Sequence, residues 1–71
     1  MISHKYKSPN YSDRVKDSKI EFIIIHHTGV DMQFQKVINW FLDERSRVSC
    51  HFLIDTSGEI YNLVDISKRA W

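Results

Sequence analysis

Two adjacent histidines, His26 and His27, follow directly after the most apolar stretch of the chain. Imidazole is the commonest protein ligand of zinc, and functional sites in open α/β sheets form beyond the carboxyl ends of the strands. Because neighbouring residues on a strand point to opposite faces, only one of the two side chains can face a given site. Two histidines without a third ligand do not make a metal site, so their spacing alone favours a hydrogen-bonding role.

A second candidate for chemistry is Cys50, which is the only cysteine and precedes His51. A thiolate and an imidazole can both bind a metal, and a cysteine beside a base can act as a nucleophile. As strand neighbours these two side chains diverge, although Cys50 could pair with His26 or His27 if their strands lie side by side. The commoner role of a single buried cysteine is packing, and the sequence favours that interpretation.

The histidine pair would be positioned by residues 20–25, which are β-branched and almost wholly apolar. Such a run is typical of a strand that is buried on both faces and is therefore central in its sheet. Gly29 gives the backbone freedom to turn after this strand. Asp31 is then a candidate N-cap for the next element.

A helix is predicted from Phe34 onward, because apolar residues recur at intervals of three and one along a single stripe. The stripe consists of Phe34, Val37, Ile38, Phe41 and Leu42, with Trp40 beside it. Two strand-like segments, residues 50–55 and 59–64, then flank Thr56-Ser57-Gly58. Two such segments around a short turn that contains glycine predict a β-hairpin.

Before these elements, residues 1–19 are polar and contain the only proline, which predicts an irregular arm pinned by Tyr6, Tyr11 and Val15. The order of arm, buried strand, helix and hairpin predicts an α/β or α+β sheet with at least one helix, and we take the α/β class, in which a central mixed β-sheet is flanked by helices. A doubly buried strand with one helix to cover it implies missing partners. We therefore expect a truncated fold, part of a larger structure.

The composition excludes several classes of protein. The 71 residues, 42% hydrophobic and 27% charged, allow one small globular domain at most. A formal charge of +1 argues against nucleic-acid binding, which requires a clustered basic face. The longest apolar run, residues 22–25, is far shorter than the roughly 20 residues that span a bilayer. The single cysteine and the lack of a readable signal peptide predict a cytoplasmic location, with the periplasm as the alternative.

Four segments of the chain, taken together, resemble one protein family. They are Ile23-Ile24-Ile25-His26-His27-Thr28-Gly29, Val48-Ser49-Cys50-His51-Phe52-Leu53-Ile54-Asp55, Gly58-Glu59-Ile60-Tyr61 and Arg69-Ala70-Trp71. In this order and at this spacing they are similar to the zinc-dependent N-acetylmuramoyl-L-alanine amidases of type 2. These are related to phage lysozyme-type amidases, to anhydro-muropeptide amidases and to peptidoglycan-recognition proteins. Ser8-Pro9-Asn10-Tyr11 also resembles the N-terminal segment of the bacterial members.

The resemblance implies a zinc hydrolase that cuts the amide bond between the lactyl group of N-acetylmuramic acid and L-alanine, in peptidoglycan or muropeptides. In that family the first Zn²⁺ ligand is the histidine that ends the first core strand, which corresponds to His26. The resemblance also implies substrate contacts for His27, Thr28, Cys50 and Trp71. The family takes its other ligands and its general acid or base from a C-terminal half. The resemblance therefore implies that residues 20–71 are the N-terminal half of an amidase-like domain, and we expect them to be inactive alone.

Two alternatives to a truncated amidase follow from the residues. The chain could be a non-catalytic muropeptide-binding or protein-interaction module, whose exposed sheet edges pair with a second copy or a complementary fragment. It could instead be an unrelated metal-binding domain that uses His26, His27, Cys50 and His51, if the hairpin starts beside the strand end. Strand alternation aims His51 away from the face of Cys50, so we interpret His51 as structural rather than as a ligand.

Overall fold

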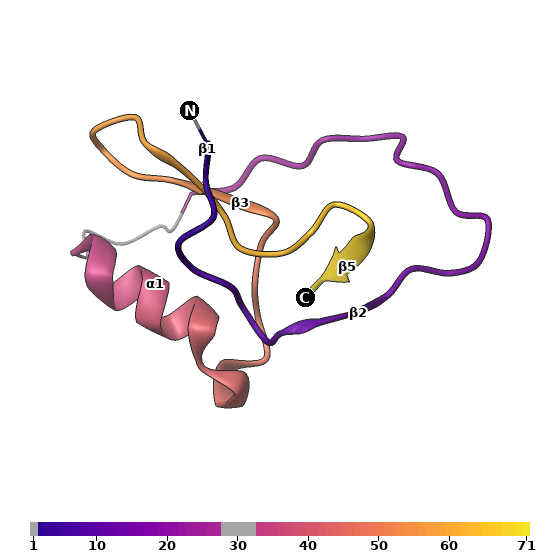
Figure 1. The fold of residues 1–71 in the computed structure, drawn as a ribbon, viewed down its shortest axis with the longest axis horizontal. Helices are drawn as coiled ribbons and strands as arrows, with labels where there is room; N and C mark the ends of the chain where they lie inside the picture. The colour runs from indigo at the N-terminus through magenta and orange to yellow at the C-terminus, as the bar shows by residue number, and fades with distance from the viewer. Residues whose placement is uncertain (1, 28–32) are drawn as a thin grey trace.

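Three strands form a mixed sheet in the computed structural model, which describes residues 2–27 and 33–71 (Figure 1). β1 (Ile2–Ser3) lies parallel to β4 (Ile60–Asn62), and β4 lies antiparallel to β3 (Phe52–Ile54). The order across the sheet is β1-β4-β3, with Ile2 opposite Ile60. A mixed sheet accompanied by a helix confirms the predicted α/β class.

The N-terminal arm is irregular for most of its length, as predicted, but it also contributes two short strands. Besides β1, it contains β2 (Tyr11–Asp13), which pairs antiparallel with β5 (Lys68–Ala70) in a separate two-stranded sheet. Of the three predicted anchors, Tyr6 packs against the core, whereas Tyr11 and Val15 are exposed. Strands of two or three residues show no readable alternation, so the hydropathy pattern could not predict them.

The predicted helix is present as α1 (Phe34–Leu42). The expected stripe faces inward, since Val37 and Ile38 are buried and the other members of the stripe pack partly against the core. Trp40 lies beside the stripe and is 56% exposed. The residue that precedes the helix is Gln33, which makes no capping hydrogen bond with its side chain, while the predicted cap Asp31 lies outside the described residues.

The predicted hairpin is confirmed, with strands β3 and β4 shorter than the sequence suggested. The Asp55 carboxylate closes the turn by accepting hydrogen bonds from the backbone N–H groups of Ser57 at 2.8 Å and Glu59 at 3.2 Å. Gly58 has a φ of 89°, a left-handed conformation that side chains disfavour. The glycine in the turn is therefore required by the backbone.

The prediction of a buried central strand over residues 20–25 is wrong. This stretch has no regular secondary structure, and Phe22, Ile23, Ile24 and Ile25 are between 77% and 89% exposed. In Figure 1 it runs along the top of the view as an open stretch of chain. A strand forms only where a neighbouring strand takes up its backbone hydrogen bonds, and no described strand lies against this stretch.

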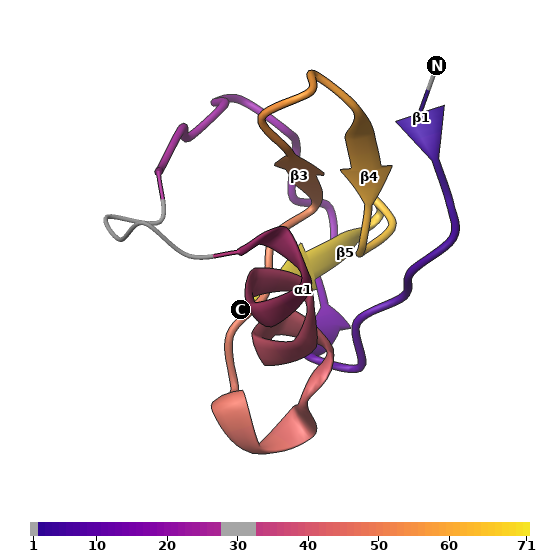
Figure 2. The same cartoon turned by 90° about the vertical axis from the view of Figure 1, so that its left-hand side faces the viewer.

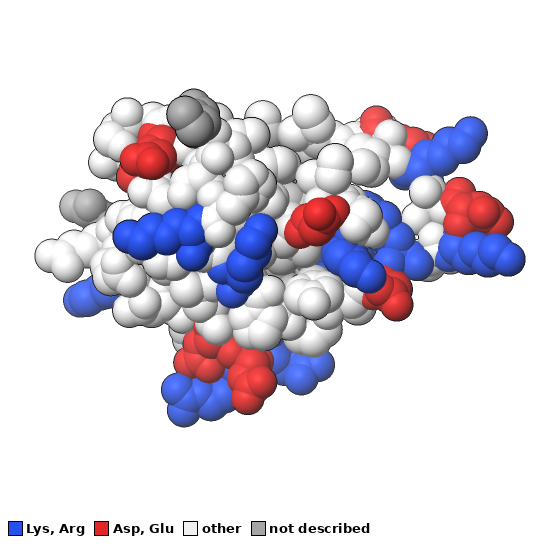
Figure 3. Space-filling view, viewed as in Figure 1, with Lys and Arg blue, Asp and Glu red and all other residues white. Residues whose placement is uncertain are grey.

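The core is small and lies between helix α1 and the chain that follows β4 (Figure 2). Ile38, Leu63 and Val64 are fully buried, and the ring of Tyr61 packs 4.9 Å from that of Phe34, measured between centroids. Acidic and basic side chains are interspersed over the face in Figure 3. No helix within the described ranges is long and apolar enough to cross a membrane. A core of this size supplies only a few kcal/mol of stability.

Candidate functional site

Asn10, in the arm just before β2, ties three parts of the chain together. Its side chain is buried, with 1% of the residue exposed, and its Nδ2 donates hydrogen bonds of 2.9 Å to the carbonyl oxygens of Asp43 and Val48. The Ser49 hydroxyl donates in turn to the carbonyl oxygen of Asn10 at 2.5 Å. These bonds fix the arm against both the end of helix α1 and the start of the segment that leads into β3.

Trp71, directly after β5, is held from two sides. Its backbone N–H donates to Ser49 Oγ at 3.0 Å, and the Ser49 N–H donates to the carbonyl oxygen of Trp71 at 2.6 Å. The indole N–H donates to Ser12 Oγ at 3.2 Å. The Arg47 guanidinium carbon lies 5.1 Å from the centroid of the indole ring, which is within cation–π range. The ring is therefore fixed in position while 38% of the residue is exposed.

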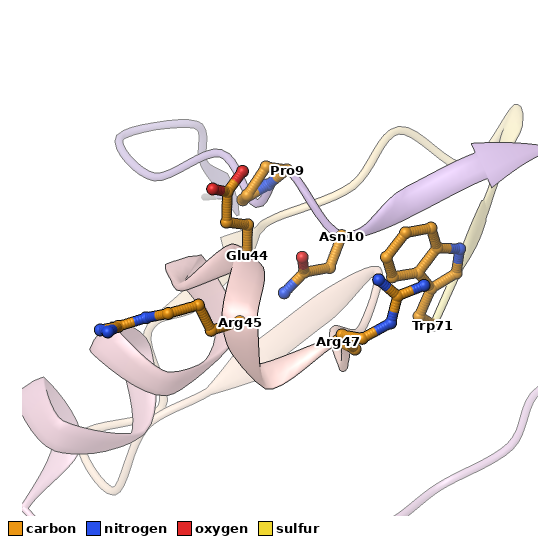
Figure 4. A pocket seen from close by; sticks show the side chains of 6 residues that line it. All are labelled: Pro9, Asn10, Glu44, Arg45, Arg47 and Trp71. Atoms are coloured by element: carbon orange, nitrogen blue, oxygen red, sulfur yellow. The ribbon is translucent and has the colours of Figure 1, made fainter.

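A shallow pocket of about 380 Å³ opens beside this indole (Figure 4). It is lined by Pro9, Asn10, Glu44, Arg45, Arg47 and Trp71. Arg45 is engaged by the Asp43 carboxylate through hydrogen bonds of 3.1 and 3.0 Å, and it points away from the indole in Figure 4. Arg47 is thus the cation that faces the ring. The lining offers an aromatic surface, the positive charge of Arg47 and the carboxylate of Glu44, and it includes no hydroxyl or thiol nucleophile.

Cys50 packs against the core residues Ile38, Leu63 and Val64. Burial raises the pKa of its thiol to about 11. The thiol is therefore protonated at neutral pH and is a poor nucleophile, which agrees with the packing role that the sequence favoured. The substrate contact that the resemblance implies for Cys50 stays a prediction.

His51 links the start of β3 to β5. Its Nε2 lies 2.8 Å from the carbonyl oxygen of Lys68, and because a carbonyl oxygen can only accept, Nε2 must be protonated and donate. Arg14 Nη2 lies 3.5 Å from the same nitrogen, but an arginine can only donate and so makes no hydrogen bond to a protonated Nε2. This nitrogen has no lone pair left for a metal. The contact agrees with the structural role predicted for His51.

His26 and His27 lie at the exposed end of residues 20–27, where no described helix or strand positions them, and Thr28 lies outside the described residues. Within residues 2–27 and 33–71, no three or more His, Cys, Asp or Glu side chains are grouped closely enough to hold a metal ion. A catalytic zinc ion takes three protein ligands. His26 is therefore one candidate ligand, and the described residues do not fit a zinc ion by themselves.

The structure separates the predicted site residues into two places. Cys50 and Trp71 are brought near each other through Ser49, which follows from the backbone pairing of Ser49 with Trp71. The end of residues 20–27 lies away from the C-terminus in both Figure 1 and Figure 2. An unrelated metal-binding domain built from the two adjacent histidines with Cys50 and His51 is not supported, because these four described residues form no metal-holding group.

The sequence did not predict that Asn10 fixes the arm by hydrogen bonds. It also did not predict that Ser12, Arg47 and Ser49 contact Trp71. Each of these residues acts through a contact with a residue far away in the sequence, which hydropathy periodicity does not report. A usable signal was Ser8-Pro9-Asn10, since serine and asparagine around a proline fix a local turn and present polar groups to nearby backbone.

Comparison with known proteins bears on residues 16–71. These residues match the family model of N-acetylmuramoyl-L-alanine amidase. The matched range contains helix α1, the β3–β4 hairpin and β5, and it includes His26, Cys50 and Trp71, whereas Asn10 precedes it. No curated protein and no solved structure matches the chain.

Proposed function

Since the chain belongs to the family of N-acetylmuramoyl-L-alanine amidases, we propose that its function is zinc-dependent cleavage of the amide bond between N-acetylmuramic acid and L-alanine. The substrate would be peptidoglycan or a muropeptide, and the process peptidoglycan catabolism. The proposal depends on one observation, the match of the family model to residues 16–71. These include every candidate site residue that the resemblance implied.

His26 is proposed as one ligand of the zinc ion. When held by three protein ligands, zinc supplies a water of lowered pKa and polarises the scissile carbonyl. Among the described residues, no three His, Cys, Asp or Glu side chains are grouped to hold a metal ion, so no hydrolytic step is assigned to them. We accordingly propose that these 71 residues alone bind zinc weakly and are inactive.

The pocket beside Trp71 favours a second candidate function, the binding of muropeptides without catalysis. The exposed indole can pack against the apolar face of a sugar ring, and the Arg47 guanidinium can pair with a carboxylate. A muropeptide presents both groups in one molecule. Binding of this kind requires only described residues, whereas hydrolysis requires ligands that the described residues do not provide.

A muropeptide incubation with and without zinc, together with a zinc titration, tests the first candidate. We expect no release of the stem peptide by mass spectrometry, and weak zinc binding that His26→Ala abolishes and His27→Ala preserves. Release of the stem peptide would overturn the proposed inactivity. Zinc affinity that falls equally in both histidine variants would contradict the choice of His26 as the ligand.

Tryptophan fluorescence tests the second candidate, because the chain has two tryptophans and Trp40→Phe leaves Trp71 as the only one. Addition of a muropeptide should change the Trp71 emission. Arg47→Ala should weaken binding about tenfold, which corresponds to one charge-assisted hydrogen bond. Arg45→Ala is the matched control and should leave binding unchanged, because Arg45 is engaged by Asp43. Equal effects of the two arginine substitutions would contradict binding in this pocket.

A further inference from the structure

The contacts that hold Trp71 differ in how far they fix its indole ring. The hydrogen bonds of the Trp71 backbone to Ser49 fix the position of the main chain, but the ring can still rotate about the side-chain torsions. The Arg47 guanidinium attracts the face of the ring without selecting a direction within its plane. The hydrogen bond of 3.2 Å from the indole N–H to Ser12 Oγ is directional. Among the described contacts, it is therefore the one that sets the orientation of the ring.

The register of β2 and β5 brings Ser12 within reach of the indole. Ser12 lies opposite Arg69 in the antiparallel pair, and Trp71 follows Arg69 by two residues. Side chains two residues apart on a strand share a face, and a diagonal neighbour on the facing strand is within reach of an aromatic side chain. Tyr11 and Asp13 point to the opposite face, because side chains alternate along a strand. Ser12 is thus the residue of β2 that can meet the indole N–H.

This register is fixed on both sides of Ser12. On one side, the Lys68 ammonium pairs with the Asp13 carboxylate at 2.6 Å. On the other side, the carbonyl oxygen of the buried Asn10 accepts a hydrogen bond from the Ser49 hydroxyl. A slip of one residue would turn Ser12 to the other face of the pair, and these contacts oppose such a slip.

We propose that Ser12 is a positioning residue of the pocket beside Trp71, which holds the indole in the orientation that a bound muropeptide meets. The inference rests on the proposed binding of muropeptides, and it adds a contribution from the arm. Pro9 and Asn10 of the arm line the same pocket (Figure 4). Ser12 precedes residues 16–71, which match the family model, so the arm extends the binding site beyond the matched range.

The orientation of the ring matters because an ordered ring loses less rotational freedom when a ligand packs against it. Removal of the Ser12 hydroxyl leaves the indole N–H without its acceptor and the ring free to rotate. One neutral hydrogen bond corresponds to a change of about threefold to tenfold in an equilibrium constant. The Arg47 contact is retained, so the affinity for a muropeptide should fall by this factor rather than disappear.

Two measurements in the Trp40→Phe background, where Trp71 is the only tryptophan, test the proposal. In the free protein, Ser12→Ala should shift the indole N–H resonance in heteronuclear NMR and speed its exchange with water. In a fluorescence titration with a disaccharide–tetrapeptide muropeptide, Ser12→Ala should weaken binding about threefold to tenfold. Ser12→Thr keeps a hydroxyl and should preserve both the resonance and the affinity. Ser18→Ala, at an exposed position of the arm, is the matched control and should change neither.

If circular dichroism shows that Ser12→Ala alters the fold, Ser12→Val takes its place, since valine matches threonine in shape and has a methyl group instead of the hydroxyl. An unchanged indole resonance in Ser12→Ala would overturn the positioning role. Equal muropeptide affinities of Ser12→Ala and its parent, or a loss that Ser12→Thr shares, would overturn it as well, while the binding function holds. If the parent binds no muropeptide, the proposed binding function fails, and this inference fails with it.

Discussion

Removing the Asn10 side chain should destabilise the fold more than its small size suggests. Asn10→Ala leaves the carbonyl oxygen of Val48 without its donor, whereas that of Asp43 still accepts hydrogen bonds from the N–H and the hydroxyl of Ser46. An unsatisfied buried acceptor costs about 1–3 kcal/mol. The loss is partly offset, because Asn10 Oδ1 is itself buried with no hydrogen-bond partner among the described residues. We expect the free energy of unfolding to fall by about 1–2 kcal/mol, a large share of the stability of a chain this small.

Asn10→Asp should be more harmful than Asn10→Ala, although aspartate has nearly the same shape as asparagine. The substitution replaces the donor Nδ2 with an oxygen that faces the same two carbonyl oxygens, and it buries a charge. In the fold, burial and the neighbouring oxygens would raise the pKa of the new carboxyl above its ordinary value. The variant should therefore recover stability relative to wild type as the pH falls through this raised pKa toward the ordinary pKa of aspartate, because protonation restores a donor.

Urea unfolding followed by far-UV circular dichroism measures these differences. Asn39→Ala is the matched control, because Asn39 is exposed on helix α1 and accepts only a hydrogen bond of 3.0 Å from the Gln35 side chain. It should change the free energy of unfolding by no more than about 0.5 kcal/mol. The reasoning is refuted if Asn10→Ala changes the free energy of unfolding by no more than about 0.5 kcal/mol, the limit expected of the control. It is also refuted if Asn10→Asp is as stable as wild type at neutral pH.

Three further predictions concern other parts of the fold. Cys50, with a thiol pKa of about 11, should react with a disulfide reagent at pH 8 roughly 100-fold more slowly than an exposed cysteine, and a rate equal to that of a free thiol would contradict its burial. Chiefly through their mutual hydrogen bond, the pKa of Asp13 is lowered and that of Lys68 is raised. The destabilisation caused by Lys68→Gln in thermal unfolding should therefore be largest between the ordinary pKa values of the two groups. It should disappear as the pH falls through the lowered pKa of Asp13 or rises through the raised pKa of Lys68, and a pH-independent effect would contradict the ion pair. Gly58→Ala should cost about 1 kcal/mol in urea unfolding because φ is 89°, even though an added Cβ would meet nothing within 4 Å, and a neutral effect would argue against this turn conformation.

The elements that the sequence predicted correctly are those built from neighbouring residues. Helix α1 follows from an apolar stripe within nine residues, and the β3–β4 hairpin follows from turn residues around Gly58. Strands β1, β2 and β5 were not predicted, because each depends on a partner far away in the chain. Residues 20–25 show the opposite failure. Their strand propensity is high, but propensity does not supply the neighbouring strand on which a strand depends.

The candidate site was predictable to a similar degree. The residue types and the family resemblance identified His26, Cys50 and Trp71, and the packing role of Cys50 agrees with the structure. The pocket was not predictable, because the position of Arg47 against the indole depends on how the chain returns after helix α1. Asn10 was missed for the same reason. Its side chain acts by hydrogen bonding to backbone carbonyl groups that are distant in sequence, and the residues next to it in the chain do not indicate these partners.

The pairing of the arm with β4 and β5 has a consequence for the order in which the chain can fold. Both strands of the arm are made well before their partners during synthesis, as the pairing of Ile2 with Ile60 illustrates. Contacts of such long sequence separation require a large loop to close before they stabilise anything, and they slow folding. On the ribosome, the arm would therefore stay unpaired until β4 and β5 have been translated. We expect the β1–β4 and β2–β5 pairs to form late in folding, and folding to be slow for so small a set of elements.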